Sequence, residues 1–589
     1  MILRSFICAA VLLTAVSLTP TRSARSRQRR AAAAEARWVE ETLKNLSLRE
    51  RLGQMLMTPV QVEQATGGRL DDLKKLVAEL GLGGVVVRGG SPEAVAALTN
   101  ELQRAARVPV FVGADYERGL RMQMKSAGTP FTNNMGVAAA GDSRAAFEQG
   151  RITAEEGRAV GVNWLFGPVA DLNNNPDNPV INVRSFGEDP KRVAEFVSAA
   201  VRGTREGGAL STAKHFPGHG DTAVDSHIGL PTIRADRARL DKLELVPFRA
   251  AISAGVDSVM TAHVALPALT GDELPATLSP KVTTELLRRE LKFDGLVVTD
   301  SLGMGAITKG FPGGEASVRA VIAGADVALT PPDLKASLDA LEAAVKGGRI
   351  TRERVDESVR RILRAKHRLG LSERRTVDID AVRNLVERPE ALLSASGVAE
   401  RSITLLRDGG GLLPLGKARA SRAAFVVIAA DEDPEEGRRF IPQVQARVPG
   451  ARLLRADPKT TAGEYDALLA EESKAETIIV AAFVKRAAGK GTVALPERQA
   501  EFVRRLVASA KPVAVVAFSG PYLVRQFPEA AAFMVAYGIE DVAQDAAARV
   551  LFGDAPARGR LPVTVPGLFA AGSGIQTKPR GDPRRMASR

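Results

Sequence analysis

Short apolar runs alternate with amphipathic stretches from about Arg37 to Leu371. Eight such runs can be counted, and they begin at Gly53, Leu82, Val108, Asn163, Ala209, Ser258, Gly295 and Ala325. Segments such as DDLKKLVAEL and SPKVTTELLRREL lie between them and have the spacing of surface helices. Because repeated strand–helix units of this number are typical of a (β/α)8 barrel, the pattern predicts a TIM-type barrel domain at residues 35–375.

The apolar pattern restarts after the segment LSERRTVDID. Its new runs are RSITLLRD, AAFVVIAAD, ETIIVAAF, PVAVVAF and AAFMVAYG, separated by helical stretches such as ERQAEFVRRLVASA. We therefore predict a second α/β domain at residues 391–569 with a mostly parallel sheet. Neither a P-loop nor a GxGxxG motif follows any of these runs, so the sequence gives no support for nucleotide binding there.

The first 24 residues have the layout of a secretory signal: Arg4, then an apolar run from about Ile7 to Leu18, then small and polar residues. The run is too short to span a bilayer comfortably. We expect an exported protein, periplasmic or secreted, without stable membrane insertion after the signal is cleaved. An uncleaved anchor is the alternative, because residues 22–30 are basic and no clean cleavage site follows the run.

The cysteine content and the net charge exclude some kinds of catalytic group and binding partner. The single cysteine, Cys8, lies inside the predicted signal, so the mature chain has neither a disulfide nor a thiol nucleophile. The net charge is +13, and part of the excess lies in TRSARSRQRR and in a basic tail at residues 570–589. Neither segment interleaves aromatic residues with arginines, so we predict no nucleic-acid partner.

Polar residues with catalytic capacity stand at the trailing ends of the predicted barrel strands. They are Asp115, Glu117, Asp171, Lys214, His215, His263 and Asp300. Because the catalytic face of such a barrel lies at the C-terminal ends of its strands, these side chains are expected to meet at one face. For any single residue, the start of a solvated loop is an equally simple explanation.

The stretch KHFPGHGDTAVDSH, residues 214–227, holds three of the five histidines of the chain. One interpretation is a metal site built from His215, His219, Asp221 and His227, but the adjacent Lys214 opposes a cation there. The other is acid/base chemistry, in which Asp225 fixes the ring of His227 and favours its protonated form. We favour the second interpretation and predict neither a metal nor a cofactor.

The stretch FDGLVVTDSLGMGAI predicts a buried strand that ends in Asp300. A carboxylate held rigidly at a strand end is suited to attack an electrophilic carbon. The alternative role is to cap the following helix.

Taken in order, ADYERG, GPVADLNNNPDNPVINVRSFGEDP, KHFPGHGDTAVDSH, LVVTDSLGMGAI and the later FSGPYL and GRLPVTVPG closely resemble glycoside hydrolase family 3. The middle motifs are similar to its β-N-acetylglucosaminidase branch, the NagZ type. The resemblance implies a catalytic TIM-type barrel followed by an α/β (αβα) sandwich. It also implies that Asp300 is the nucleophile, that His227 supported by Asp225 is the acid/base, and that the sugar is bound by Asp115, Arg184, Lys214 and His215.

The activity expected from this resemblance is that of a retaining exo-β-N-acetylglucosaminidase acting on terminal β-linked GlcNAc, with peptidoglycan fragments (muropeptides) as the natural source. A family 3 β-glucosidase or β-xylosidase, a GlcNAc phosphorylase, an inactive cell-wall-binding protein and a metallohydrolase are the alternatives. One departure bears on specificity: the chain reads DYERGLRMQM where the branch runs Asp-x-Glu-Gly-Gly-Arg-x-x-Arg, so Arg121 is displaced by one position.

Overall fold

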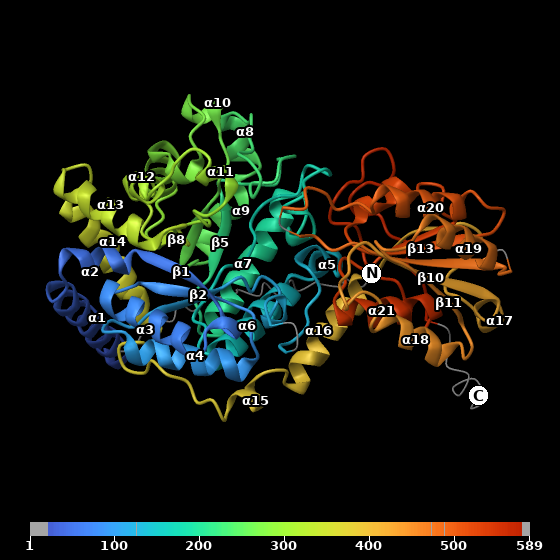
Figure 1. Cartoon of the computed structure of the whole chain (residues 1–589), viewed down its shortest axis with the longest axis horizontal. Coiled ribbons are helices and arrows are strands. Elements are labelled where there is room, and N and C mark those ends of the chain that lie inside the picture. The colour runs from blue at the N-terminus through green and yellow to red at the C-terminus, as the bar shows by residue number, and fades with distance from the viewer. Residues whose placement is uncertain (1–21, 125–126, 473, 488, 580–589) are drawn as a thin grey trace, which may run out of the picture.

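The computed structural model describes residues 22–124, 127–472, 474–487 and 489–579, which form two lobes side by side (Figure 1). The larger lobe holds the elements from α1 (Arg22–Lys44) to α14 (Arg352–Arg368), and the second lobe begins after α16 (Pro389–Ser402). The signal is predicted at residues 1–24, and residues 1–21 of it lie outside the described residues. None of the described helices is long and apolar enough to cross a membrane.

The larger lobe is a closed barrel of eight parallel strands, as predicted. Each predicted run overlaps one of them: β1 Leu56–Gln61, β2 Gly84–Arg88, β3 Phe111–Ala114, β4 Trp164–Leu165, β5 Thr212–Phe216, β6 Ser258–Thr261, β7 Leu296–Thr299 and β8 Ala328–Leu329. The strands form sheets of order β4-β3-β2-β1-β8 and β5-β6-β7. Parallel bridges from Trp164 to Leu210 and from Val298 to Val327 join the two sheets and close the barrel.

Helices surround the barrel because their apolar stripes face its strands. The principal ones are α2 Leu48–Gln54, α3 Gly68–Leu80, α4 Pro92–Ala105, α6 Ser143–Ala159, α7 Pro190–Glu206, α9 Leu245–Ser253, α12 Glu315–Ala323 and α13 Leu334–Lys346. The predicted helix SPKVTTELLRREL is observed at Lys281–Glu290 as a π-helix, η5. Several helices begin at side-chain caps, such as Asp189 before α7 and Asp333 before α13.

Inside the barrel, strand residues are buried on both faces, as expected for a parallel sheet covered by helices. Trp164 is fully buried, and its indole Nε1 donates hydrogen bonds to the hydroxyls of Thr212 and Ser258, each at 2.9 Å. One side chain of β4 thereby ties together the starts of β5 and β6. This rigid interior fixes the strand ends that carry the site.

The second lobe is an αβα sandwich, which confirms the predicted fold class. Its sheet has the order β11-β10-β12-β13-β14-β9, in which only β9 is antiparallel. The strands are β9 Thr404–Asp408, β10 Ala423–Ala429, β11 Arg452–Ala456, β12 Thr477–Phe483, β13 Val513–Phe518 and β14 Ala532–Val535. One face packs against α16, α18 (Phe440–Arg447) and α21 (Asp541–Phe552), and the other against α19 (Ala462–Glu472) and α20 (Glu497–Val507).

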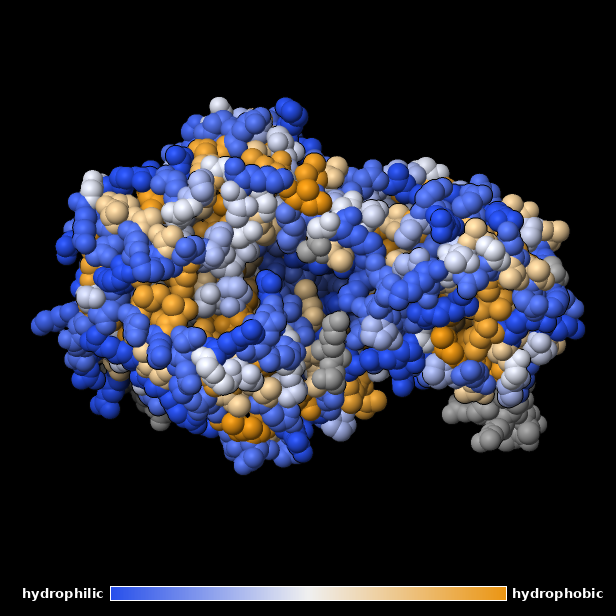
Figure 2. All heavy atoms as spheres, viewed as in Figure 1, coloured by the Kyte–Doolittle hydropathy of each residue, from blue (hydrophilic) through white to orange (hydrophobic). Residues whose placement is uncertain are grey.

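Apolar and polar contacts join the two lobes. Met135 and Ala139 of α5 (Asn134–Ala139) belong to the same buried cluster as Tyr537 of the second lobe. The amide of Asn133 donates to the Tyr537 carbonyl at 2.8 Å, and that of Asn173 donates to the Tyr522 hydroxyl at 2.8 Å. On the face drawn in Figure 2, a hollow lined largely by hydrophilic residues lies between the lobes.

Candidate active site

A pocket opens at the C-terminal ends of the barrel strands. It encloses about 1890 Å³ of space, part of it open to solvent. Six of the seven site residues predicted from the sequence line it: Asp115, Arg184, Lys214, His215, His227 and Asp300. The seventh, Asp225, lies behind the wall and contacts His227. Strand ends far apart in the sequence are thus brought to one face.

Asp300 follows directly on β7, and its backbone N–H donates to the Thr261 carbonyl at 3.1 Å. Its carboxylate accepts a hydrogen bond from the Ser301 N–H at 2.7 Å. Burial by itself would raise the pKa of Asp300, but the nearby imidazoles of His215 and His263, the Ser301 N–H and the Lys214 ammonium outweigh it and lower the pKa to about 2. Asp300 is therefore an ionised carboxylate at the pocket wall.

A network of alternating charges lies beside Asp300. The buried Lys214 ammonium donates to Asp115 at 2.9 Å and contacts Glu117 at 2.8 Å. Glu117 accepts two hydrogen bonds from the Arg184 guanidinium, at 3.0 and 2.6 Å. Burial opposes ionisation of Glu117, but Arg184 and Lys214 hold its pKa well below the ordinary value. The carboxylate thereby fixes two cations that face the pocket.

Asp171, at the end of the fourth apolar run, holds in place the segment of residues 214–227, which we call the histidine loop. This buried carboxylate accepts hydrogen bonds from the backbone N–H of His215 at 3.1 Å and of His219 at 2.7 Å. It also contacts the His215 Nδ1 at 2.7 Å, while an Arg184 nitrogen lies 3.3 Å from the His215 Nε2. Asp171 therefore fixes the orientation of the His215 ring, whose Nε2 edge lies toward Arg184.

The Asp225–His227 pair forms as predicted. The Nδ1 of His227 lies 2.7 Å from Asp225 Oδ1, and the same oxygen accepts the His227 backbone N–H at 2.9 Å. The second oxygen of Asp225 accepts the backbone N–H of Gly489, in the second lobe, at 2.8 Å. Burial raises the pKa of Asp225, but these hydrogen bonds lower it below the ordinary value. With Nδ1 turned to Asp225, the half-exposed ring presents Nε2 to the pocket.

The histidine loop packs directly on the segment that follows Asp300. The Ala306 N–H donates to the Ser226 carbonyl at 3.2 Å. At Gly305, an added Cβ would lie only 2.6 Å from the His227 carbonyl oxygen, so the close approach of the two segments requires glycine. The loop carrying His227 is therefore fixed next to the strand end that carries Asp300.

The metal interpretation of the loop does not agree with its geometry. Both ring nitrogens of His219 are engaged by hydroxyls, those of Thr222 at 3.0 Å and Ser226 at 2.9 Å. Burial lowers the pKa of His219 to about 4, so its ring is neutral at physiological pH. Asp221 is paired with Arg239. Across the described ranges, no group of three or more His, Cys, Asp or Glu side chains is placed to hold a metal ion.

The sequence did not indicate the contacts that four residues of the site make. Glu117 and Asp171 stand at strand ends, which could have identified them as partners of the cations and of the histidines. His219 braces the loop through Ser226. Arg486 enters the pocket from the second lobe, and nothing in the local sequence pattern indicated it.

Comparison with known proteins agrees with this arrangement along both lobes. Residues 47–365 match the model of the glycosyl hydrolase family 3 N terminal domain, and residues 403–579 match that of its C-terminal domain. A β-N-acetylglucosaminidase/β-glucosidase of Cellulomonas fimi is 30% identical over 546 residues, which cover 89% of this chain and 95% of that protein. β-Hexosaminidase A of Pseudoalteromonas piscicida is 33% identical over 377 residues, covering 58% and 62%.

Solved structures show the same likeness. A glycoside hydrolase family 3 β-N-acetylglucosaminidase from Paenibacillus sp. str. FPU-7 is 35% identical, with a TM-score of 0.79, over 88% of this chain and 99% of that one. A β-glucoside phosphorylase is 28% identical, with a TM-score of 0.81, over 90% and 97%. Both likenesses extend across the two lobes.

Proposed function

Because the chain belongs to glycoside hydrolase family 3, we propose that it is a retaining exo-β-N-acetylglucosaminidase that releases terminal β-linked GlcNAc. The observation that supports this most directly is one pocket lined by the ionised Asp300 and by His227, whose ring is fixed by Asp225. The similar β-N-acetylglucosaminidase and β-hexosaminidase support the choice of sugar.

In the first step, a carboxylate oxygen of Asp300 attacks the anomeric carbon. The bond between that carbon and the leaving oxygen breaks, and His227 Nε2 gives its proton to the leaving oxygen. In the second step, His227 removes a proton from water, whose oxygen attacks the anomeric carbon and displaces Asp300. Two displacements at the same carbon retain its configuration. The first step requires an ionised Asp300, which its lowered pKa provides.

The charged network would bind and orient the sugar. Asp115 is the half-exposed member, and Lys214 already holds one of its oxygens, so the other oxygen is available to a sugar hydroxyl. Lys214 and Arg184 offer charge-assisted donors from a buried wall. Because Glu117 fixes the Lys214 and Arg184 side chains before substrate binds, these side chains lose little further conformational freedom on binding.

The test is a panel of 4-nitrophenyl β-glycosides with the wild type and Asp300→Ala. We expect turnover of the GlcNAc glycoside, and a loss of at least about 10³-fold in kcat in the variant, because the attacking group is removed. Asp294→Ala is the matched control, since Asp294 is exposed just before the other end of β7. Turnover of the glucoside or xyloside only would reject the proposed sugar.

The role of His227 is tested separately, with β-GlcNAc glycosides whose leaving groups differ in basicity. His227→Ala should lose about 10²-fold or more with a poor leaving group and far less with 2,4-dinitrophenolate, which departs without a proton. Equal losses for both leaving groups would exclude His227 as the proton donor.

Phosphorolysis is the second candidate, since the likeness to a β-glucoside phosphorylase covers both lobes. An imidazole, unlike a second carboxylate, carries no negative charge that would repel phosphate. In that case phosphate replaces water in the second step. A phosphate oxygen bonds to the anomeric carbon as the bond from that carbon to Asp300 breaks, and His227 takes the proton of the attacking phosphate hydroxyl. A rate that rises with phosphate and yields sugar 1-phosphate would establish this reaction.

We further propose that the substrates are muropeptides and that the enzyme acts outside the cytoplasm, in the periplasm or after secretion. The support for export is the N-terminal sequence. Release of GlcNAc from purified muropeptides and recovery of the mature protein outside the cytoplasm would test the two points.

A further inference from the structure

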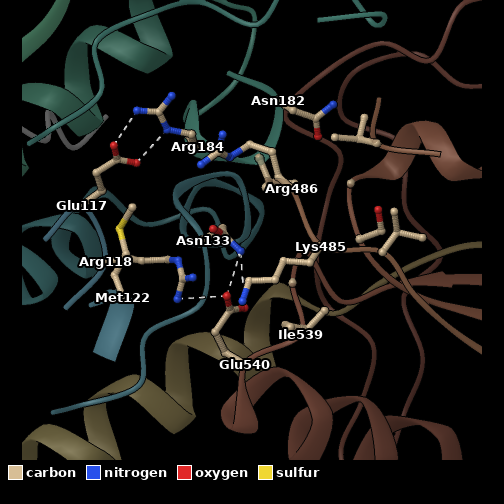
Figure 3. Close-up of a pocket in the computed structure, with 16 residues that line it drawn as sticks. Glu117, Arg118, Met122, Asn133, Asn182, Arg184, Lys485, Arg486, Ile539 and Glu540 are labelled. Carbon is tan, nitrogen blue, oxygen red and sulfur yellow. Dashed lines mark hydrogen bonds and ion pairs between the residues drawn. The ribbon is translucent and has the colours of Figure 1, made fainter. Parts of the chain in front are cut away.

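A cavity that encloses about 540 Å³ of space, part of it open to solvent, lies between the two lobes, next to the catalytic pocket (Figure 3). Its walls include Arg118 and Asn133 from the barrel lobe and Lys485 and Glu540 from the second lobe. Glu117, Arg184 and Arg486 line both this cavity and the catalytic pocket. The two spaces therefore share a wall at the domain boundary.

Most charges around the cavity are paired. Arg118 lies 2.9 Å from Glu540, Arg184 lies 2.6 Å from Glu117, and Lys485 lies 2.7 Å from Asp433. Arg486 is different: within the part of the chain that the structure describes, no hydrogen bond or ion pair reaches its guanidinium. Figure 3 shows this side chain extending from the second lobe toward Glu117 and Arg184.

Arg486 is partly buried, so its guanidinium has lost part of its hydration, and no anion among the described residues replaces it. Burial and then the neighbouring charge of Arg184 lower the pKa of Arg486 to about 10, which still leaves it a cation at neutral pH. Arg88 also lines the catalytic pocket, but it is exposed, so water can solvate it. Arg486 therefore has five N–H donors and a full charge for which none of the described residues supplies an acceptor.

The same loop also contacts the acid/base pair. It follows β12, and three residues after Arg486 the Gly489 N–H donates to Asp225. Asp225 is among the charges that influence Arg486. Arg486 thus lines the catalytic pocket from a loop that also contacts the acid/base pair.

We propose that Arg486 forms an oxyanion subsite at the domain boundary, which binds a carboxylate or phosphate group beside the Asp225–His227 pair. Its place in the reaction rests on the proposed function, whereas the binding of an anion does not. A planar guanidinium matches either group with two parallel hydrogen bonds. The anion has two possible sources: a carboxylate on the aglycone, or free inorganic phosphate.

Anion binding is tested without turnover. Thermal unfolding is followed with sodium phosphate up to about 50 mM, with sodium chloride keeping the ionic strength constant. We expect phosphate to raise the unfolding midpoint of the wild type by about 1–2 °C more than that of Arg486→Gln, with Arg486→Lys in between. Arg525→Gln is the matched control, since Arg525 pairs with Asp177 across the boundary at 2.6 Å and lines neither space. It should respond to phosphate as the wild type does.

Kinetics then identify the source of the anion. The ratio of kcat/KM for 4-carboxyphenyl over 4-carbamoylphenyl β-GlcNAc isolates a carboxylate on the aglycone. Arg486→Gln should lower that ratio about tenfold if the aglycone supplies the anion, or remove the effect of phosphate on the rate if phosphate does. The subsite is rejected if Arg486→Gln changes neither the ratio, nor the phosphate effect, nor the midpoint shift. Failure of the proposed function would appear instead as absence of GlcNAc turnover in the wild type, with the midpoint shift unaffected.

Discussion

At the scale of single residues, the proposed mechanism requires an ionised Asp300, so its pKa sets the lowest pH at which the reaction can proceed. Its pKa is lowered to about 2, because nearby imidazoles, the Ser301 N–H and Lys214 outweigh the effect of burial. A folded-state pKa below the ordinary value means that Asp300, the proposed nucleophile, is neutralised only when the pH falls toward 2. At pH 3.5, a carboxyl group with the ordinary pKa near 3.8 would be only about one-third ionised.

We therefore expect the second-order rate of inactivation by an activated fluorosugar to be flat from pH 6 down to about pH 3.5. Such a reagent suits the measurement because its fluoride leaves without a proton, so the rate reports the attack alone. Circular dichroism at each pH checks that the protein stays folded. A fall to about one-third at pH 3.5 would contradict the lowered pKa.

At this scale, the sequence predicts which strand-end side chains lie at the pocket, but it does not indicate side chains whose position depends on tertiary contacts. Asp300, Lys214 and His215 end predicted strands, and all three line the pocket. The position of Arg486 in the sequence does not indicate that it lines the pocket, because it approaches Glu117 only when the two lobes pack together. His219 was weighed as a metal ligand, whereas both of its nitrogens are engaged by hydroxyls.

At the scale of elements, two loops hold the proposed acid/base pair, His227 and Asp225, in place. The segment after β7 binds the histidine loop through the Ala306 N–H, and the loop after β12 binds Asp225 through the Gly489 N–H. The second lobe therefore supplies a hydrogen bond to the Asp225–His227 pair, although both members of the pair lie in the barrel lobe. We infer that this hydrogen bond helps to keep the Asp225 carboxylate oriented toward His227.

Gly489→Pro removes that N–H, and Gly491→Pro is its matched control. Both glycines have positive φ, 75° and 70°, so proline strains the backbone at either position, but only the first change removes the donor to Asp225. With a poor leaving group, kcat of Gly489→Pro should be about tenfold below that of Gly491→Pro, a part of the roughly 10²–10⁴-fold that a positioned acid/base supplies. Equal kcat values for the two variants would show that the Gly489 contact does not support the acid/base.

The elements themselves were largely predictable. All eight barrel strands and five of the six strands of the second lobe overlap the predicted apolar runs. The exception, β11, carries Arg452 and Arg455 and stands at the edge of its sheet, where partial exposure weakens the apolar signal. The π-helical form of η5 was not predicted, because the apolar pattern indicates a helix without specifying its hydrogen-bond spacing.

At the scale of the whole molecule, the two lobes share part of a hydrophobic core. Met135 and Ala139 lie in barrel sequence, yet they belong to the buried cluster of the second lobe with Val183, Tyr537 and Leu561. Glu188 of the barrel lobe also accepts the Thr564 N–H at 2.8 Å and its hydroxyl at 2.6 Å. Neither lobe can unfold without exposing apolar surface of the other.

We therefore expect thermal unfolding in a single cooperative transition, although chains of this size often unfold domain by domain. Calorimetry measures this as agreement between the calorimetric and van't Hoff enthalpies. Met135→Ala sharpens the test, because its cavity costs about 2–5 kcal/mol and should lower the midpoint of the one transition by about 2–4 °C. If the lobes were independent, two transitions would appear and the substitution would move only the one that holds the cluster. Both the subsite of Arg486 and the contact of Gly489 with Asp225 depend on the two lobes staying together. A single transition for both lobes would therefore mean that these two features persist until the whole chain unfolds.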